Sequence, residues 1–291
     1  MATTLLDIKR RINTTSQIRR VTATLQKVAS AKLAKDLQRI GNANTYFQKI
    51  CDMLRLAHNS LPSDSTIHPL MTPQHGNTIS LIVFGSDRGL CGSFNTQLME
   101  AVRKFIKLNP ESEIQLYLRG KVVYRRALRL KLTNMHNIEE TEEIADLMQK
   151  EFLTKKAAKI YILYWDYITS ANQKVVTEQI LPTPFTGKTP EVRSQKSEVR
   201  GQKGTSPHQA SNIKHQPSFP LIEPNPSALI DALLPEYVRC SIHNGFFNSL
   251  VTENTMRRAS MTRATENAGE MLTDLKKLTV DCAKPASQQK C

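Results

Sequence analysis

The first sixty residues place apolar side chains at every third or fourth position, the spacing of one face of an α-helix. This segment, residues 1–60, contains no proline and a single glycine, Gly41. At 1.5 Å per residue such a helix is on the order of 80 Å long, too long to bury its apolar face alone. The apolar steps change between Ile12 and Ile18, so we expect no strict heptad repeat.

A second long helix is predicted over residues 224–280. Asn225 suits the N-cap position and Pro226 suits the first turn. Pro235 lies inside the apolar pattern, so we expect a kink there or a break between two helices. The pattern fades near residue 278 and Pro285 follows, so residues 281–291 are expected to form a separate tail.

The two long helices are expected to pack as an antiparallel coiled coil, because that arrangement covers both apolar faces at once. The predicted stripe consists of Ile8, Ile12, Ile18, Val21, Leu25 and Val28 in the first helix, and Leu250, Met261, Leu272 and Leu275 in the last.

Residues 76–185 follow a different pattern, in which short apolar runs alternate with helical segments. Such alternation is typical of an α/β domain with a largely parallel, Rossmann-like sheet. Strands are expected at residues 79–84, 114–118, 132–135, 159–165 and 175–181, and helices at 94–108, 122–130 and 144–153.

Residues 186–219 are rich in Lys, Gln, Ser, Pro and Gly and contain few large apolar side chains. Two similar hexapeptides begin at Glu191 and Glu198. Such a segment cannot bury enough apolar surface to offset its ordering entropy, so we expect a disordered, basic insertion.

The composition narrows the class of protein. Of the 291 residues, 40% are hydrophobic and 23% are charged. No stretch approaches the roughly 18 apolar residues of a membrane span, and we see no secretory signal. The five cysteines are scattered without a Cys-x-x-Cys pair. This pattern argues against a disulfide framework or a zinc site and favours a protein of a reducing compartment.

The net charge of +14 predicts an acidic partner, whether nucleic acid, an anionic membrane surface or an acidic protein. The first helix carries much of the imbalance, since eleven Lys and Arg residues accompany only three aspartates between residues 4 and 60. Charge alone does not choose among these partners.

The glycine loop, residues 85–92, follows a predicted strand and precedes a predicted helix, which is where phosphate-binding loops occur. Its spacing fits neither common phosphate-binding motif, so a tight turn that needs glycines is the preferred interpretation. Cys91 has no histidine or second cysteine nearby in sequence, so we expect a buried thiol. The seven histidines show no metal-binding spacing, and no catalytic cluster or cofactor site is predicted.

Segments at four places along the chain resemble the gamma subunit of F-type ATP synthases. They are Asp-Ile-Lys-Arg-Arg-Ile and Val-Ala-Ser-Ala-Lys-Leu in the first helix, at residues 7–12 and 28–33; Ser-Asp-Arg-Gly-Leu-Cys-Gly in the glycine loop, followed by Phe94 and Asn95; Glu-Pro-Asn-Pro at residues 223–226; and residues 253–275 in the last helix. The resemblance covers roughly residues 1–185 and 220–278.

The resemblance implies a non-catalytic central-stalk rotor of a rotary, proton- or sodium-translocating ATP synthase. The coiled coil would turn inside the alpha/beta hexamer, and the α/β domain would lie near the c-ring with the epsilon subunit beside it. The chain would bind no nucleotide, no nucleic acid and no cofactor. It would work at the cytoplasmic face of a bacterial energy-transducing membrane. Contacts with the beta subunit are implied for Arg88, Leu90, Cys91, Lys27 and Arg257.

The chain departs from the family pattern at three places. Lys27 stands where the family usually has methionine, and Asn254 replaces the usual histidine or glutamine. The family's Tyr-Asn-x-x-Arg-Gln-Ala segment, whose Arg-Gln pair meets the beta subunit, is missing after residue 278. The resemblance therefore implies a short shaft tip.

Three alternatives to a working rotor stay open on sequence alone. A degenerate gamma paralogue would explain the missing tip. A basic coiled-coil protein that binds nucleic acid would explain the charge, although only 6% of residues are aromatic and no recognition module is present. An α/β enzyme would use the glycine loop for nucleotide.

Overall fold

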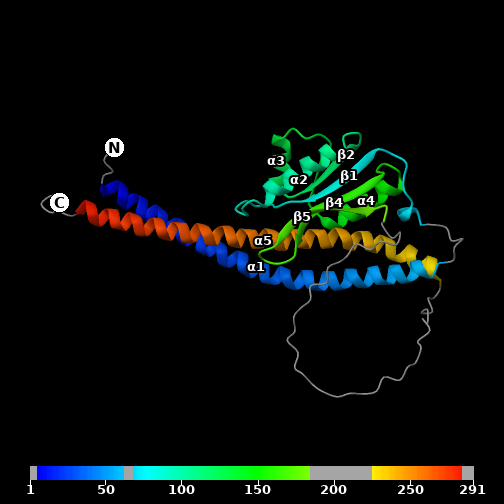
Figure 1. Ribbon diagram of the computed structural model, residues 1–291, viewed down its shortest axis with the longest axis horizontal. Coiled ribbons are helices and arrows are strands. Elements are labelled where there is room, and N and C mark those ends of the chain that lie inside the picture. Colours follow the sequence, from blue (N-terminus) through cyan, green and yellow to red (C-terminus); the bar gives the residue numbers. More distant parts are fainter. Residues whose placement is uncertain (1–4, 62–67, 184–224, 284–291) are drawn as a thin grey trace, which may run out of the picture.

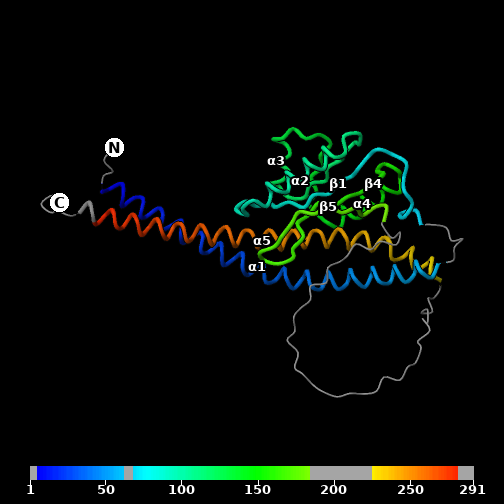
Figure 2. Tube along the Cα trace, in the orientation of Figure 1, coloured from blue at the N-terminus to red at the C-terminus, as the bar shows by residue number. Residues whose placement is uncertain are grey.

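Two long helices and one small sheet domain make up the molecule (Figure 1). The computed structural model describes residues 5–61, 68–183 and 225–283. Helix α1 (Leu5–Asn59) and helix α5 (Pro226–Ala283) lie side by side, and the start of α1 and the end of α5 lie together at the end of the pair away from the sheet (Figures 1 and 2). The predicted insertion at residues 186–219 and most of the predicted tail lie outside the described residues.

The helix pair is antiparallel, as predicted. Three side-chain contacts between α1 and α5 set its register: Thr15 with Met271 at 3.8 Å, Thr22 with Thr265 at 2.8 Å, and Asp36 with Asn254 at 2.8 Å. Residue numbers rise along one helix while they fall along the other. The protruding part of the pair is called the shaft below, and comprises residues 5–36 and 254–283.

The predicted apolar stripe is wrong for part of α1. Ile18, Val21 and Val28 are 50%, 57% and 48% exposed rather than buried against α5. The contacting positions instead continue from Ile8 in alternating steps of four and three residues, so a heptad register persists where we expected a change. The seam was hidden because these positions hold polar or small side chains, namely Thr15, Arg19, Thr22, Gln26, Ala29 and Asp36.

The remaining stripe predictions agree with the structure. Ile8, Met261 and Leu272 are buried, with at most 8% of each side chain exposed. Intermediate burial is found at Ile12, Leu25, Leu250 and Leu275.

Helix α5 continues through Pro235, so the break that was one of two expectations does not occur. Its first turns are inclined to the remainder of the helix (Figure 2), which agrees with a kink. The carbonyl of Pro235 accepts a hydrogen bond of 3.0 Å from Gln149 Nε2, so a neighbouring helix supplies a donor at the irregularity. The helix ends at Ala283, three residues beyond the predicted end at residue 280.

A five-stranded sheet with the order β3-β2-β1-β4-β5 forms the centre of the second domain. The first four strands run parallel, and β5 pairs antiparallel with β4. The strands are β1 (Thr78–Phe84), β2 (Glu113–Arg119), β3 (Met135–Ile138), β4 (Lys159–Tyr167) and β5 (Gln173–Leu181). The helices are α2 (Phe94–Leu108), α3 (Lys121–Arg129) and α4 (Thr141–Leu153), with a 3₁₀ turn at Pro69–Met71. The predicted largely parallel sheet is confirmed.

Strand β3 starts three residues later than predicted, because residues 131–134 form a turn that precedes the strand. Lys131 and Asn134 have φ values of 53°, which place them in the left-handed region used by tight turns. The strand then follows at the edge of the sheet.

Each face of the sheet has its own apolar core. Helices α2 and α3 cover one face through Phe94, Leu98 and Val123, all fully buried. Helices α4 and α5 cover the other face and α1 packs against α5, so that Ile50 and Leu54 of α1 join Tyr237 of α5 in the core on this side. The coiled coil is therefore a layer of the α/β domain along one part of its length and stands free along the rest (Figure 1).

Candidate functional site

The glycine loop connects β1 to α2 and passes beside α5. A Cβ atom added at Gly85 would lie 2.1 Å from Val123, and one added at Gly120 would lie 2.6 Å from the Gly85 carbonyl carbon. Gly92 has a φ of +59°, a conformation that glycine adopts without strain. The glycines serve close backbone packing and a tight turn, as the preferred interpretation of the sequence predicted.

A hydrogen-bond network inside the loop holds its shape. Asn95 Nδ2 donates to Ser86 Oγ at 2.7 Å, and the backbone N–H of Ser86 donates to Asn95 Oδ1 at 3.2 Å. Ser86 Oγ donates to the carbonyl of Arg88 at 2.9 Å. Asn95 Nδ2 also lies 3.2 Å from Cys91 Sγ. Sequence reasoning attached no role to Ser86, and treated Asn95 only as part of a motif.

The loop presents two of the predicted contact residues and hides a third. The side chains of Arg88 and Leu90 are exposed, and Leu90 is 61% accessible with a φ of 64°. Cys91 is only 2% exposed, and burial raises the pKa of its thiol above the ordinary value. The expectation of a buried, unactivated thiol is confirmed, and Cys91 presents no surface to a partner in this conformation.

Arg257 faces the molecule rather than solvent, with 15% of its side chain exposed. Its Nη2 pairs with Glu253 Oε1 at 2.5 Å and its Nη1 donates to Asn254 Oδ1 at 3.1 Å. The same guanidinium donates to the carbonyls of Arg88 and Gly89 at 3.2 and 3.4 Å. The structure thus brings Arg257 to the glycine loop, as an internal contact.

Lys27 is exposed on the shaft and belongs to none of the contacts between Arg257 and the glycine loop. It precedes Asp36 by nine residues, which is about 13 Å along the helix axis. Asp36 itself is 5% exposed and joins the cluster through Asn254. The Asp36–Asn254 pair was not predicted, although its signal was available: a seven-residue repeat counted from Ile8 places Asp36 in the seam.

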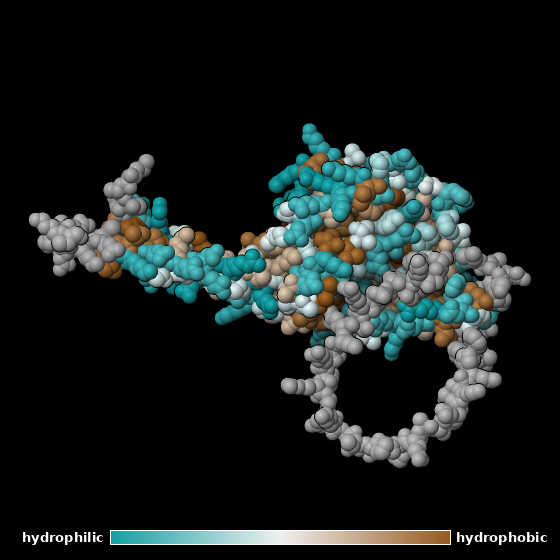
Figure 3. All heavy atoms as spheres, viewed as in Figure 1, coloured by the Kyte–Doolittle hydropathy of each residue, from teal (hydrophilic) through white to brown (hydrophobic). Residues whose placement is uncertain are grey.

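Apolar side chains remain uncovered on the outside of the shaft. Besides Ile18, Val21 and Val28, the exposed set includes Leu5, Leu6, Met271, Leu278 and Val280, each at least 39% accessible. Figure 3 shows hydrophobic atoms at the far end of the shaft and along its length, between hydrophilic ones.

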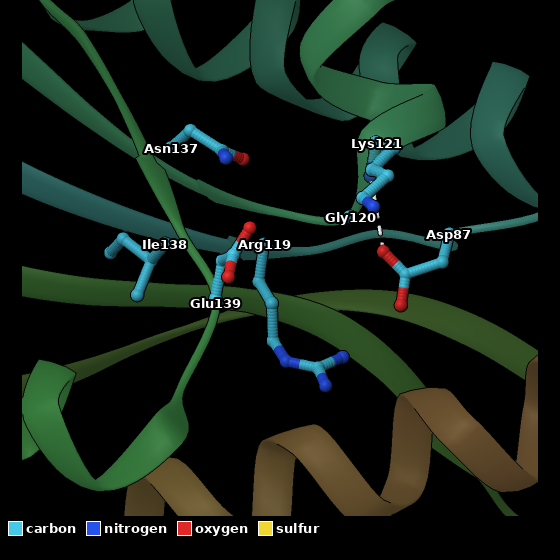
Figure 4. Close-up of a pocket in the computed structure, with 7 residues that line it drawn as sticks. All are labelled: Asp87, Arg119, Gly120, Lys121, Asn137, Ile138 and Glu139. Carbon is cyan, nitrogen blue, oxygen red and sulfur yellow. Dashed lines mark hydrogen bonds between the residues drawn. The ribbon is translucent and has the colours of Figure 1, made fainter.

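A pocket of about 220 Å³ lies at the carboxyl ends of β1, β2 and β3, the edge where nucleotide-binding sheets hold their ligands (Figure 4). Asp87 and Glu139 line it together with Arg119 and Lys121, so its charges balance. The Asp87 carboxylate accepts the backbone N–H of Lys121 at 3.2 Å. The Arg119 guanidinium lies 4.1 Å from the ring centroid of Phe246. The volume is below the roughly 300 Å³ of small ligand pockets.

Among the described residues, no group of three or more His, Cys, Asp or Glu side chains could hold a metal ion. None of the described helices is both long and apolar enough to cross a lipid bilayer.

Comparison with known proteins covers nearly the whole chain. Residues 4–280 match the ATP synthase family. A gamma chain of ATP synthase from Clostridium perfringens is 29% identical over 280 residues, covering 93% of this chain and 89% of that protein. A gamma chain from Haemophilus influenzae is 26% identical, covering 97% and 93% of the two chains.

A solved structure shares the fold. It is the rotor of the mitochondrial ATP synthase of Euglena gracilis, which matches with a TM-score of 0.61 and 12% identity over 96% of both chains. The long helix pair, the parallel sheet and the glycine loop agree with the resemblance drawn from sequence, and the comparisons support neither the nucleic-acid-binding nor the enzyme alternative. The chain therefore belongs to the ATP synthase family, as a gamma-type subunit.

Proposed function

We propose that this chain is the central-stalk rotor of an F-type ATP synthase. In this role the shaft turns inside a hexamer of alpha and beta subunits, and the sheet domain connects it to the membrane c-ring with the epsilon subunit alongside. The chain would carry torque between ion flow and the nucleotide sites of beta, and would perform no chemistry itself. The similar Euglena gracilis structure is called a rotor, which supports this assignment.

The observation that carries the proposal is the exterior of the shaft. Two helices project beyond the sheet domain; their seam includes the buried polar residues Thr15 and Asp36, while apolar residues such as Ile18 and Val21 are exposed. A free-standing helix pair would be expected to bury most of its apolar residues. The exposed apolar residues fit a shaft that is enclosed by other subunits.

Charge supports the same partner. Exposed Lys27 lies on the shaft and exposed Arg88 lies on the glycine loop, so each presents a positive charge beside apolar surface. We propose that these two residues and Leu90 meet an acidic surface of beta during rotation. The bacterial gamma chains among its relatives support a place at the cytoplasmic face of a bacterial energy-transducing membrane.

Assembly with separately purified alpha and beta subunits of its own source tests the proposal. The wild-type chain is expected to co-elute with them in size-exclusion chromatography as one complex. Replacing Ile18 and Val21 by aspartate should weaken the complex without unfolding the chain, because both side chains are exposed. A folded wild-type chain that does not join the alpha and beta subunits would contradict the proposal.

A further inference from the structure

One side chain connects the glycine loop to the shaft. The Arg257 guanidinium uses all three of its nitrogens: Nε and Nη2 donate to the loop carbonyls of Arg88 and Gly89, and Nη1 donates to Asn254 within α5. Its ion pair with Glu253 is largely shielded from water, since the two side chains are 15% and 13% exposed. The loop carbonyls therefore receive a charged donor at a fixed position.

The contact continues into the second shaft helix. Asn254 accepts from Arg257 through Oδ1 and donates to Asp36 of α1 through Nδ2 at 2.8 Å. Asn254 and Asp36 are 3% and 5% exposed. The chain of hydrogen bonds from the loop carbonyls through Arg257 and Asn254 to Asp36 is called the Arg257 network below.

The loop is stiff at the point that Arg257 holds. The carbonyl of Arg88 accepts both from Arg257 Nη2 and from Ser86 Oγ. Ser86 is in turn bonded to Asn95 in the first turn of α2. The exposed side chains of Arg88 and Leu90 are thus mounted on backbone that is fixed from two sides.

We propose that Arg257 is a positioning residue: it fixes the partner-facing part of the glycine loop to both shaft helices, so that a load on Arg88 or Leu90 passes directly to the shaft. The force-carrying part of this inference rests on the rotor function proposed above. It also replaces the expectation that Arg257 itself contacts beta.

The geometry requires arginine. A lysine could keep the ion pair with Glu253, but one ammonium nitrogen cannot also reach two loop carbonyls and Asn254 in the fixed fork of a guanidinium. The neighbouring Arg258 is a matched control, because it lies on the same helix and makes none of the described ion pairs.

Trypsin cleavage of the isolated full chain measures the attachment of the loop. The side chain of Arg88 is accessible, but its backbone is held by hydrogen bonds. Trypsin can therefore cut the peptide bond after Arg88 only when the loop opens locally. Mass spectrometry would follow cleavage after Arg88 relative to cleavage after Arg103 in α2, a ratio that discounts global unfolding. Arg257→Met should raise this ratio about tenfold or more.

Two further variants complete the test. Arg258→Met should leave the ratio unchanged, and Arg257→Lys should give a value between those of the wild type and Arg257→Met. The inference is overturned if Arg257→Met leaves the ratio at the wild-type value, or if Arg258→Met raises it equally.

A second arm tests the role of the network in torque. In the complex with alpha and beta subunits, Arg257→Met should still assemble but stall at a smaller opposing load than Arg258→Met. Equal stalling loads would overturn the force-carrying role even if the loop is loosened. Failure of the wild-type chain to assemble would instead contradict the rotor function, and would leave the proteolysis result standing for the loop.

Discussion

The same two helices behave differently beside the sheet and beyond it. Beside the sheet, Phe47, Ile50 and Leu54 of α1 join Tyr237 and Ile242 of α5 in one apolar core, all at most 5% exposed. In the shaft the seam combines apolar residues such as Leu33 and Met261 with threonines and a buried aspartate, while other apolar side chains, such as Val21, are exposed. One coiled coil therefore contains a three-layer core and a two-helix seam.

The difference shows how stability and contact are divided along the molecule. The sheet gives the helices a third layer, so large apolar side chains there are surrounded on all sides and stabilise the fold. In the shaft, hydrogen bonds such as Asp36–Asn254 specify the register at some expense of stability. The outer apolar residues then remain free to contact other subunits.

The largest expected effect is a loss of packing beside the sheet. Ile50→Ala should lower the free energy of unfolding by about 3 kcal/mol, because the side chain is 1% exposed and lies within a closed core. Leu272→Ala in the shaft should cost about 1 kcal/mol, since its two-helix environment is more open. Urea unfolding followed by circular dichroism measures both, and equal losses would contradict the division.

The second-largest loss of stability is expected for the buried Asp36–Asn254 pair. Asp36→Leu leaves the Asn254 amide buried and unpaired, so we expect a loss of about 2 kcal/mol. The double variant with Asn254→Leu should lose clearly less than the sum of the two single losses, because the effect of Asn254→Leu on Arg257 occurs in the single and the double variant alike and cancels in a double-mutant cycle. A coupling energy near zero would show that the pair does not set the register.

A pH effect on stability is expected from Glu178 on the sheet side, and in the same direction from Glu253, whose pKa burial also raises. Burial raises the pKa of Glu178 on β5, whose Oε2 accepts from Tyr164 Oη at 3.1 Å. Between the unfolded pKa near 4.5 and the raised folded pKa, the folded chain holds a proton that the unfolded chain has released. Stability should therefore fall as pH rises through this window, by at most about 1.4 kcal/mol per pH unit.

Glu178→Gln should flatten this part of the stability profile, whereas Glu100→Gln at an exposed position of α2 should not. Chemical denaturation at several pH values measures the slope. An unchanged slope in Glu178→Gln would place the titrating group elsewhere.

The smallest expected effect on stability is on the outer face of the shaft. Ile18→Ser should change the free energy of unfolding by less than about 0.5 kcal/mol, because the side chain is half exposed. Its effect should appear instead in the affinity for the alpha and beta subunits. A large loss of stability in the isolated chain would mean that Ile18 packs within the coiled coil after all.

The sequence predicted the elements well and the shaft seam poorly, for a physical reason. The buried strand β1 and the amphipathic helix α2 are recognisable from their apolar pattern, because their apolar side chains pack in a core. The seam of a two-helix shaft can be polar, as at Thr22, and its exposed face apolar, as at Val21. Periodicity therefore assigned three exposed positions, Ile18, Val21 and Val28, to the seam.

In the glycine loop, too, one feature was predictable from sequence and another was not. Its turn was predictable, because glycine spacing reports backbone geometry. The position of Arg257 was not, since its partners Arg88 and Gly89 are distant in sequence and accept through backbone carbonyls that carry no residue-specific signal.

Direct observation of rotation tests the central claim. A probe would be attached to the sheet domain at Leu108→Cys, which is 70% exposed at the end of α2, with Cys282 and Cys291 replaced by serine. In a complex with immobilised alpha and beta subunits, ATP is predicted to drive the probe in one direction. Random fluctuation of the probe, while the bound complex hydrolyses ATP, would contradict the proposal that this chain is a rotor.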